Sequence, residues 1–419
     1  MMRIKRIISL FLIFVLSAGL FASCGKNDGG STPDTSGVSD PFDTNDATAT
    51  GGDEEPADET KRISFFAAGD NIIHECVYLD AMSAAASVGS DGDYYFENMY
   101  SNVRGDIEGA DIAFINAEGP LDTDYRPSGY PNFNAPAEAG DALVNVGFDI
   151  INLANNHMLD LYKGVGMQGT IDFWKTKDVV TIGAYESRSD YNDIRVMEKD
   201  GVKIAFLSYT YGTNGIYLGT DTPDLYVPYI EDSELKRQMA DAKELADVVI
   251  VSMHWGDENV FEPTSEQKRL AGLLADLGAD VLIGHHSHTI QPIEWIEGES
   301  GNKTLVIYSL GNFIHTQINS KNLVGAYVTF DIVSEKGEEP HVENAVFTPT
   351  VCHYTANTAV LDSLDYYKRE NVKIYKLSEY TEELAKSHGC QYWTAFTLDT
   401  LRGYVTDTID PEFLPENWK

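Results

Sequence analysis

Seven apolar runs of strand length recur along the chain between residues 63 and 311, and stretches with helical periodicity lie between several of them. Apolar strands that alternate with helices are typical of an α/β domain whose sheets are buried. This pattern constrains the fold more than any other feature of the sequence. The runs are ISFFAAG (63–69), DIAFIN (111–116), DIINLAN (149–155), VKIAFLSY (202–209), DVVIVSMH (247–254), DVLIGH (280–285) and KTLVIYSLG (303–311).

The clearest helix lies between the fifth and sixth runs, over residues 265–278. Its apolar residues fall on one helical face, and Gly278 stands where a helix would end. The residues of that face are Leu270, Leu273, Leu274 and Leu277.

Polar side chains cluster where the apolar runs stop. In open α/β sheets, ligands bind outside the carboxyl ends of the strands. Carboxylate, imidazole and amide groups delivered together to that edge are what a two-metal hydrolytic site requires. The strand-end sequences are GDNIIH (69–74), NAEG (116–119), NNHMLD (155–160), HWGDE (254–258), GHHSH (284–288) and SLGNF (309–313).

The GHHSH sequence is the most specific of these motifs. An extended chain places residues i and i+2 on the same side, so His286 and His288 are expected to converge on one ion while His285 points away. Six of the ten histidines lie in the strand-end motifs. Some roles stay open: Asp160 either caps a helix or orients His157, and Asn312 either forms a turn or bonds a ligand side chain.

Six motifs, in order, resemble those of the CapA-type poly-γ-glutamate capsule synthesis proteins (PGA_cap domain), a divergent branch of the calcineurin-like metallophosphoesterases. They are GDNIIH, NAEGPL, NLANNHMLD, HWGDE, GHHSHTIQP and SLGNF. The resemblance implies a four-layer αββα sandwich with its site at one edge of the two sheets. It places this metallophosphatase-like domain at 63–352, followed by a mostly helical extension at 353–419.

The resemblance also implies roles for individual residues. His157 would be the general acid, with Asp160 beside it, and Glu118 would bridge two divalent ions, which the mixed N and O donors leave open as Mn, Fe, Zn or Mg. His74 and Glu258 are expected as additional ligands. The full set of expected metal ligands is Asp70, His74, Glu118, Asn156, His254, Glu258, His286 and His288.

Three departures from the metallophosphoesterase pattern concern the groups that handle phosphate. His74 stands four residues after Asp70 instead of two, the second motif offers no Arg, and no Gly precedes Asn156. Two functions therefore stay open: a metal-dependent hydrolase or transferase that acts on a cell-envelope polymer, and a non-catalytic capsule assembly or export factor. An amidohydrolase barrel also uses an HxH pair, but there the pair follows the first strand.

The N-terminus predicts export and membrane anchoring. Basic residues, a short apolar run and Ala22-Ser23-Cys24 form a secretory signal over 1–24 that resembles a bacterial lipoprotein signal, which implies acylation of Cys24. Residues 25–62 carry ten acids and one aromatic residue, and such a segment is expected to be a disordered linker. We therefore expect an extracytoplasmic protein held at the cell membrane by its lipid.

The charge of the chain limits its partners. With 66 acidic against 30 basic residues the formal net charge is −36, which argues against nucleic-acid binding. The family resemblance implies an anionic cell-envelope polymer or its precursor, and the capsule synthesis machinery, as partners. An anionic polymer would need a metal ion or a local basic patch to be held.

Overall fold

The computed structural model describes residues 60–222, 224–356 and 368–419, which belong to one compact unit. The predicted signal segment with Cys24, and nearly all of the predicted linker, lie outside the described residues. Within the described ranges, no helix has the length and apolar character needed to cross a membrane.

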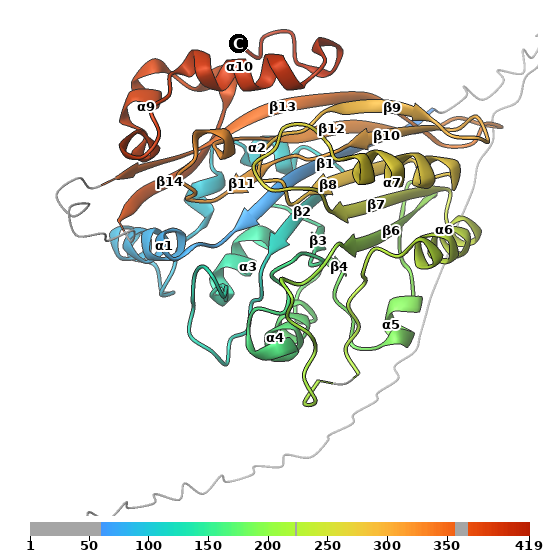
Figure 1. Ribbon diagram of the computed structural model, residues 1–419, viewed down its shortest axis with the longest axis horizontal. Coiled ribbons are helices and arrows are strands. Elements are labelled where there is room, and N and C mark those ends of the chain that lie inside the picture. The colour runs from blue at the N-terminus through green and yellow to red at the C-terminus, as the bar shows by residue number, and fades with distance from the viewer. Residues whose placement is uncertain (1–59, 223, 357–367) are drawn as a thin grey trace, which may run out of the picture. The chain divides into compact units, whose positions relative to one another are not determined.

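The first sheet has eight strands and is mixed (Figure 1). The strands β1 to β4 pair in parallel, while β12, β13 and β14 continue the sheet in antiparallel pairs. The short strand β11 pairs in parallel with the end of β1. The order is β14 (Arg369–Lys376), β13 (His341–Ala356), β12 (Val324–Ser334), β1 (Lys61–Ile72), β2 (Ile112–Glu118), β3 (Ile150–Asn152) and β4 (Val180–Ile182), with β11 (Asn312–Ile314) beside β1.

The second sheet has six strands, of which the central four are parallel and the two outer ones antiparallel. Its order is β5 (Arg195–Lys199), β6 (Val202–Thr210), β7 (Val248–His254), β8 (Val281–His285), β10 (Lys303–Ile307) and β9 (Ile293–Glu297). The arrowheads of β1, β2, β6 and β7 all point toward the left of Figure 1, so their carboxyl ends meet at one edge.

The two sheets pack face to face because successive residues of each strand point to opposite sides. Phe65 of β1 stacks against Phe206 of β6, with ring centroids 6.4 Å apart. The next residue, Phe66, points to the opposite face of the sheet, where it contacts Phe148 in the segment that follows α3. The other face of β6, which includes Leu207, packs with residues of α6 and α7. The predicted α/β fold with αββα layers is therefore confirmed.

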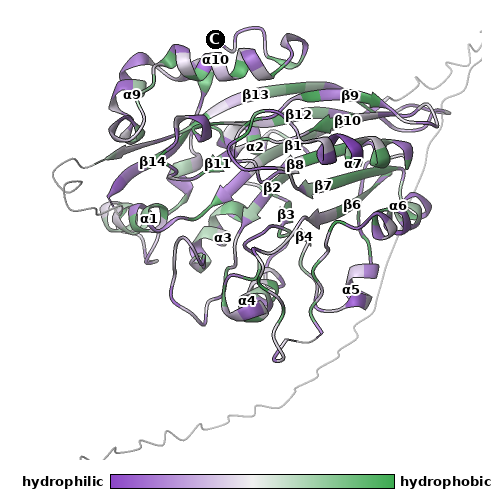
Figure 2. Cartoon of the chain, in the orientation of Figure 1, coloured by the Kyte–Doolittle hydropathy of each residue, from purple (hydrophilic) through white to green (hydrophobic). Residues whose placement is uncertain are grey.

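The helices cover the outer faces of both sheets. The helix predicted over 265–278 is α7; Thr264 and Gln267 form a capping box at its start, and Gly278, with φ of +84°, follows its end. Its green and purple residues show the two-faced pattern (Figure 2). The bounds are α1 (Glu75–Val88), α2 (Arg104–Glu108), α3 (Ala137–Asn145), α4 (Val165–Trp174), α5 (Arg188–Asn192), α6 (Asp232–Leu245), α7 (Ser265–Asp276), α9 (Glu382–Ser387) and α10 (Leu398–Thr408).

The C-terminal part adds strands to the first sheet before it turns helical. β13 continues past residue 353, the expected start of the helical extension, and β14 pairs with it along the edge. The helices α9 and α10 follow. Tyr404 of α10 contacts the loop after β7, where its ring lies 5.1 Å from that of Phe261.

Candidate metal centre

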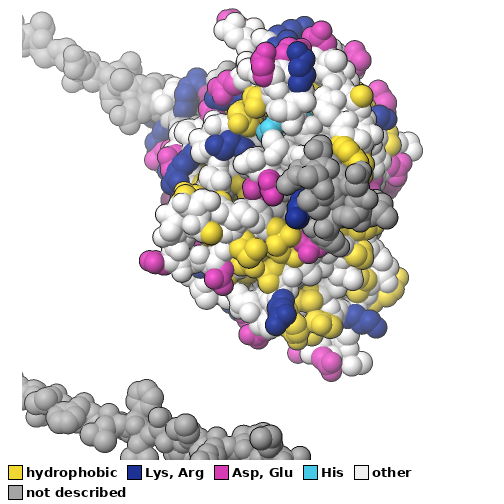
Figure 3. Space-filling model, turned by 90° about the vertical axis from the view of Figure 1, so that its left-hand side faces the viewer, with side chains coloured by type: hydrophobic (Ala, Val, Ile, Leu, Met, Phe, Trp, Pro, Cys, Tyr) yellow, Lys and Arg dark blue, Asp and Glu magenta, His cyan; other side chains and the backbone are white. Residues whose placement is uncertain are grey.

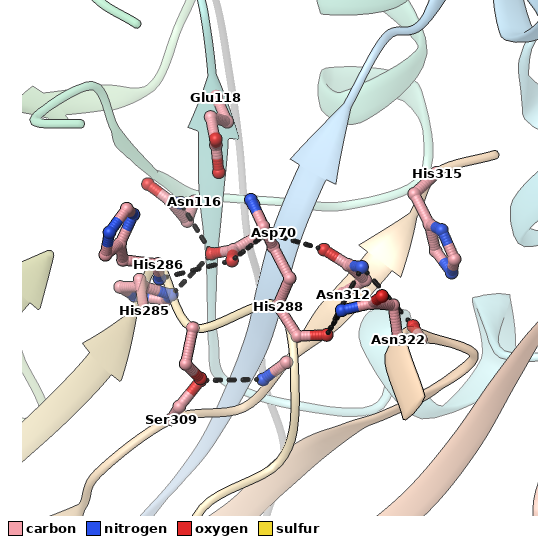
Figure 4. A network of polar contacts seen from close by, with 12 residues as sticks. Asp70, Asn116, Glu118, His285, His286, His288, Ser309, Asn312, His315 and Asn322 are labelled. Atoms are coloured by element: carbon pink, nitrogen blue, oxygen red, sulfur yellow. Dashed lines mark hydrogen bonds and ion pairs between the residues drawn. The ribbon is translucent and has the colours of Figure 1, made fainter. Parts of the chain in front are cut away.

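Strand ends from both sheets bring predicted ligands to one edge, as Figure 4 shows for Asp70, Glu118, His286 and His288. Asp70 lies near the end of β1 and Glu118 is the last residue of β2. His254 ends β7, and His286 and His288 follow β8 directly. The loop after β3 carries Asn156, His157 and Asp160. The parallel direction of these strands explains why residues so distant in sequence meet here.

Asp70 lies at the centre of this network. Its Oδ1 accepts a hydrogen bond from Asn116 Nδ2 (2.8 Å) and lies 3.2 Å from His285 Nδ1. Its Oδ2 accepts the backbone N–H of His286 (3.2 Å) and lies 3.3 Å from His288 Nδ1. Burial opposes ionisation, but the hydrogen bonds and charges of His285 and His288 outweigh it and hold the pKa of Asp70 well below its usual range. Asp70 is therefore a fixed carboxylate.

Glu118 gives the strongest indication of a cation site. Both of its carboxylate oxygens are buried and accept no hydrogen bond, and Figure 4 draws no contact to them. Burial raises the pKa of Glu118 to about 7, although the charge of His288 opposes the rise. A buried carboxylate without partners is costly unless a positive charge compensates it. Its oxygens thus fit the ligand set of a divalent cation.

Glu118, Asp70 and His288 form a set with the spacing of metal ligands. One ligand atom from each lies within 4.8 Å of the others, and among the described residues this is the group of His, Cys, Asp and Glu that meets that spacing. Burial lowers the pKa of His288, but the nearby carboxylates of Glu118 and Asp70 raise it overall to about 9. A proton on His288 supplies positive charge that a metal ion would otherwise supply.

A second set of neutral donors lies beside this triad. His254 Nε2 lies 2.9 Å from Asn156 Oδ1, and the His254 and His286 rings are 4.8 Å apart. Burial lowers the pKa of His286 to about 3 and holds that of His254 well below its usual value. Both rings are therefore neutral, the form that binds metal, and the Nδ1 atom of each is buried without a hydrogen-bond partner.

His157 is held by Asp160 and faces the triad. Its Nδ1 lies 2.7 Å from Asp160 Oδ2, and its Nε2 lies 4.0 Å from Glu118 Oε1. Burial lowers the pKa of His157, but the hydrogen bond to Asp160 and the charge of Glu118 raise it overall. The same Asp160 oxygen accepts the backbone N–H of Phe133 (2.9 Å), which fixes the carboxylate in place. Of the two roles left open for Asp160, the structure favours orientation of His157.

His74 and Glu258 lie outside the triad. His74 directly precedes α1, and its Nδ1 accepts the backbone N–H of Thr316 at 3.4 Å. Glu258 is exposed on the loop after β7, and its charge makes a smaller contribution to the raised pKa values of Glu118 and His288. Their roles as metal ligands stay predictions.

The expectation that His285 points away from the ligands is wrong. His285 is fully buried and faces Asp70 Oδ1. The alternation argument assumed an extended chain, but His286 and His288 have φ of +90° and +54°. Such backbone costs about 1–3 kcal/mol at each residue, and the surrounding contacts hold it in place. The turn allows all three histidines to approach the site.

Sequence reasoning missed a chain of amides behind Asp70. Asn152 Nδ2 donates to Asn116 Oδ1 (2.7 Å), and Ser208 of the second sheet donates to Asn152 Oδ1. The Asn-x-Glu spacing offered only a weak signal for Asn116. On the other side, Asn312 Oδ1 lies 3.0 Å from His288 Nδ1, so Asn312 does bond an expected ligand side chain.

Known proteins resemble this chain in sequence over the part that contains the site. Residues 64–317, which contain every expected metal ligand, match the family described as bacterial capsule synthesis protein PGA_cap. The chain is 34% identical to "PGA biosynthesis protein CapA" of Bacillus subtilis over 43% of its own length and 46% of the relative's. It is also 34% identical to "Capsule biosynthesis protein CapA" of Bacillus anthracis, over 44% of each chain.

The chain thus spans slightly less than half the length of these curated relatives. The solved structure of a "Putative 5'-Nucleotidase from Staphylococcus aureus" aligns with a TM-score of 0.41 and 16% identity, over 69% of this chain and 54% of the other. The match over residues 64–317 covers more than half of the 419 residues. The chain therefore belongs to the PGA_cap family of bacterial capsule synthesis proteins.

Proposed function

We propose that this protein takes part in capsule or poly-γ-glutamate biosynthesis at the outer side of the cell membrane, as a metal-dependent hydrolase with a dinuclear site. Membership of the PGA_cap family and the names of its Bacillus relatives support the capsule role. The observation that carries the metal-dependent activity is the buried, unpartnered carboxylate of Glu118 beside Asp70 and His288.

Two groups of residues would hold the ions. Asp70, Glu118 and His288 would supply one charged group, while Asn156, His254 and His286 would supply neutral donors beside it. Divalent ions in such a site polarise a carbonyl or phosphoryl oxygen and lower the pKa of bound water. The chain gives no preference among Mn, Fe, Zn and Mg.

His157 would donate a proton to the leaving group of the reaction. Its Nδ1 is engaged by Asp160, so Nε2, on the side of Glu118, is the atom that would donate to a leaving group. The raised pKa of His157 favours the protonated ring that a general acid needs. Asp160 would act as a positioning residue that fixes the orientation of the ring.

A non-catalytic assembly or export role is the second candidate. It is favoured by the polar partners of Asp70, Glu118 and His157, which among the described residues are amides, imidazoles and carboxylates and include neither Lys nor Arg. Cleavage of an anionic polymer at this site would need basic side chains that neutralise the charge of the bound polymer. This protein would then position a polymer without cleaving it.

One experiment separates the two roles. The full chain, loaded with Mn²⁺ or Zn²⁺, is assayed against a panel of phosphoesters and γ-glutamyl peptides, beside Asp70→Ala and His157→Asn. Turnover that both substitutions abolish supports the hydrolase. A cell in which Asp70→Ala protein, at normal level, still gives full polymer display would favour the assembly role.

Membrane anchoring through Cys24 is a separate part of the proposal. It rests on the lipoprotein-like signal over 1–24. Cys24→Ser should abolish lipid labelling and move the protein out of the membrane fraction of a bacterial host. Equal membrane content of the variant and the parent protein would contradict it.

A further inference from the structure

Exposed tyrosines gather on the loops around the candidate metal centre. Of the eleven large hydrophobic side chains that are exposed among the described residues, five are tyrosines that follow β2, β3 or β6. Three of them are far more exposed than a packing role requires: Tyr130 (78%), Tyr217 (73%) and Tyr162 (63%). Clustered exposed apolar surface marks an interaction site. The set, called the tyrosine rim below, is Tyr125, Tyr130, Tyr162, Tyr211 and Tyr217.

The tyrosine rim is continuous with the metal-centre histidines. The Tyr211 ring lies 4.5 Å from that of His286. On the other side, Phe133 lies edge-on to His157 at 4.8 Å, and Tyr130 contacts Phe133. Figure 3 looks onto the left side of Figure 1, toward which the strands point, and shows hydrophobic side chains in yellow gathered over its middle and lower parts.

A cavity of 520 Å³ lies within the rim, between the loops after β3 and β6. Tyr162, Lys163 and Tyr217 line it together with Thr220, Asp221 and Thr222. The two loops are joined at Lys163, whose backbone oxygen accepts from the N–H of Gly219 (2.8 Å) and from Thr222 Oγ1 (3.2 Å).

Asn214 connects this cavity to the metal centre. Gly215, the next residue, lines the cavity. Asn214 Oδ1 accepts from Asn156 Nδ2 (3.1 Å), and its Nδ2 lies 3.4 Å from His157 Nδ1. A molecule in the cavity would therefore be next to the residues proposed to carry out the chemistry.

The charges around the cavity restrict its ligand. The four site loops, residues 119–136, 153–164, 211–231 and 255–264, hold nine Asp and Glu against Arg126 and Lys163. This acidic surface repels a polyanion. In the cavity itself, Lys163 and Asp221 supply one charge of each sign, so the lining has no net charge that would select a cation or an anion. A neutral, polar ligand is not repelled by the acidic loops and needs no net charge in the cavity.

We propose that the tyrosine rim and its cavity bind a neutral glycan chain. Tyr rings stack against the apolar C–H faces of pyranose rings, while their hydroxyls and the Thr and Asp groups hydrogen-bond sugar hydroxyls. This glycan site is distinct from the proposed metal-dependent activity. It rests on the proposed function only in that the glycan would be part of a cell-envelope polymer. Sugar binding itself needs no metal ion.

The test is calorimetric titration of the full chain with neutral tetrasaccharides of glucose, galactose and N-acetylglucosamine. At least one should bind, and the Tyr162→Ala/Tyr217→Ala double variant should weaken that binding about tenfold or more. Tyr392→Ala is the control, because Tyr392 is 50% exposed but stands outside the rim, and it should bind as the parent does.

Three results would overturn the proposal: no binding of any tetrasaccharide, binding that survives the double substitution, or binding of poly-γ-glutamate or pentalysine that the double variant loses instead. The same titration with Glu118→Gln keeps the two proposals apart. Sugar binding that persists in this variant supports a glycan site independent of the metal centre, and sugar binding that is lost there refutes that independence.

Discussion

Replacing Glu118 by Gln should stabilise the metal-free protein and remove most of the stabilisation that metal binding gives. Gln keeps the shape of Glu but carries no charge. In the metal-free parent, Glu118 buries a carboxylate that accepts no hydrogen bond, which the variant avoids. In the metal-loaded parent that same carboxylate is satisfied, whereas the variant has lost a ligand.

The magnitude follows from the pKa of Glu118, which burial raises from 4.5 to about 7. At about 1.4 kcal/mol per pKa unit, ionisation of Glu118 costs the folded metal-free protein about 3 kcal/mol. A folded-state pKa above the unfolded value means that stability is lost as the pH rises from 4.5 through 7. The variant should therefore be the more stable metal-free protein at pH 8, and the difference should shrink at pH 5.

The assay is thermal unfolding by calorimetry at pH 8, first with a chelator and then with excess Mn²⁺ or Zn²⁺. Metal at about 100 times its dissociation constant should stabilise the parent by about 2.7 kcal/mol and the variant by much less. Glu343→Gln is the control, because Glu343 forms an exposed ion pair with Arg62, and such pairs contribute about 0–1 kcal/mol. A metal-free variant less stable than the parent, or one that metal stabilises equally, would refute the reasoning.

Three further predictions concern other parts of the molecule. His157→Gln should reduce turnover about 10²–10⁴-fold and leave metal content unchanged, as judged by steady-state kinetics and elemental analysis. Phe206→Ala, between the sheets, should lower the free energy of unfolding by about 3–5 kcal/mol in denaturant titrations, and a loss below 1 kcal/mol would contradict the packing. Asp280→Asn should stabilise the protein at pH 7 by up to about 3 kcal/mol, because burial raises the pKa of Asp280 to about 6. Ionisation of Asp280 therefore lowers the free energy of unfolding of the parent as the pH rises through 6, and the variant avoids this loss. Equal dependence of stability on pH in parent and variant would contradict this prediction.

The sequence pattern predicted an α/β fold with buried sheets and the edge that carries the site, because buried parallel strands leave a strong signal in apolar runs. The αββα layers were implied by the family resemblance. The strand ends also indicated Asp70, Glu118 and His288, which the structure brings together. These are local signals: each residue directly ends or follows a strand, so its position needs only the topology of the sheet.

The contacts that sequence reasoning missed depend on backbone turns and on loop closure. Left-handed backbone at His286 and His288 accompanies the approach of His285 to Asp70. The residue types at these positions do not predict a left-handed conformation. Asn214 reaches His157 from a loop 57 residues away, a distance in sequence that no motif spans. The amide chain behind Asp70 was equally hidden, because Asn at a strand end is common.

The metal content of the purified full chain tests the central claim most directly. After loading and removal of excess ions, elemental analysis of the parent should find two divalent ions per chain. The His286→Ala/His288→Ala variant should retain none at the same protein concentration, while the exposed Glu343→Gln control should retain both. A folded parent without stoichiometric metal, or a histidine variant with undiminished metal content, would contradict the account.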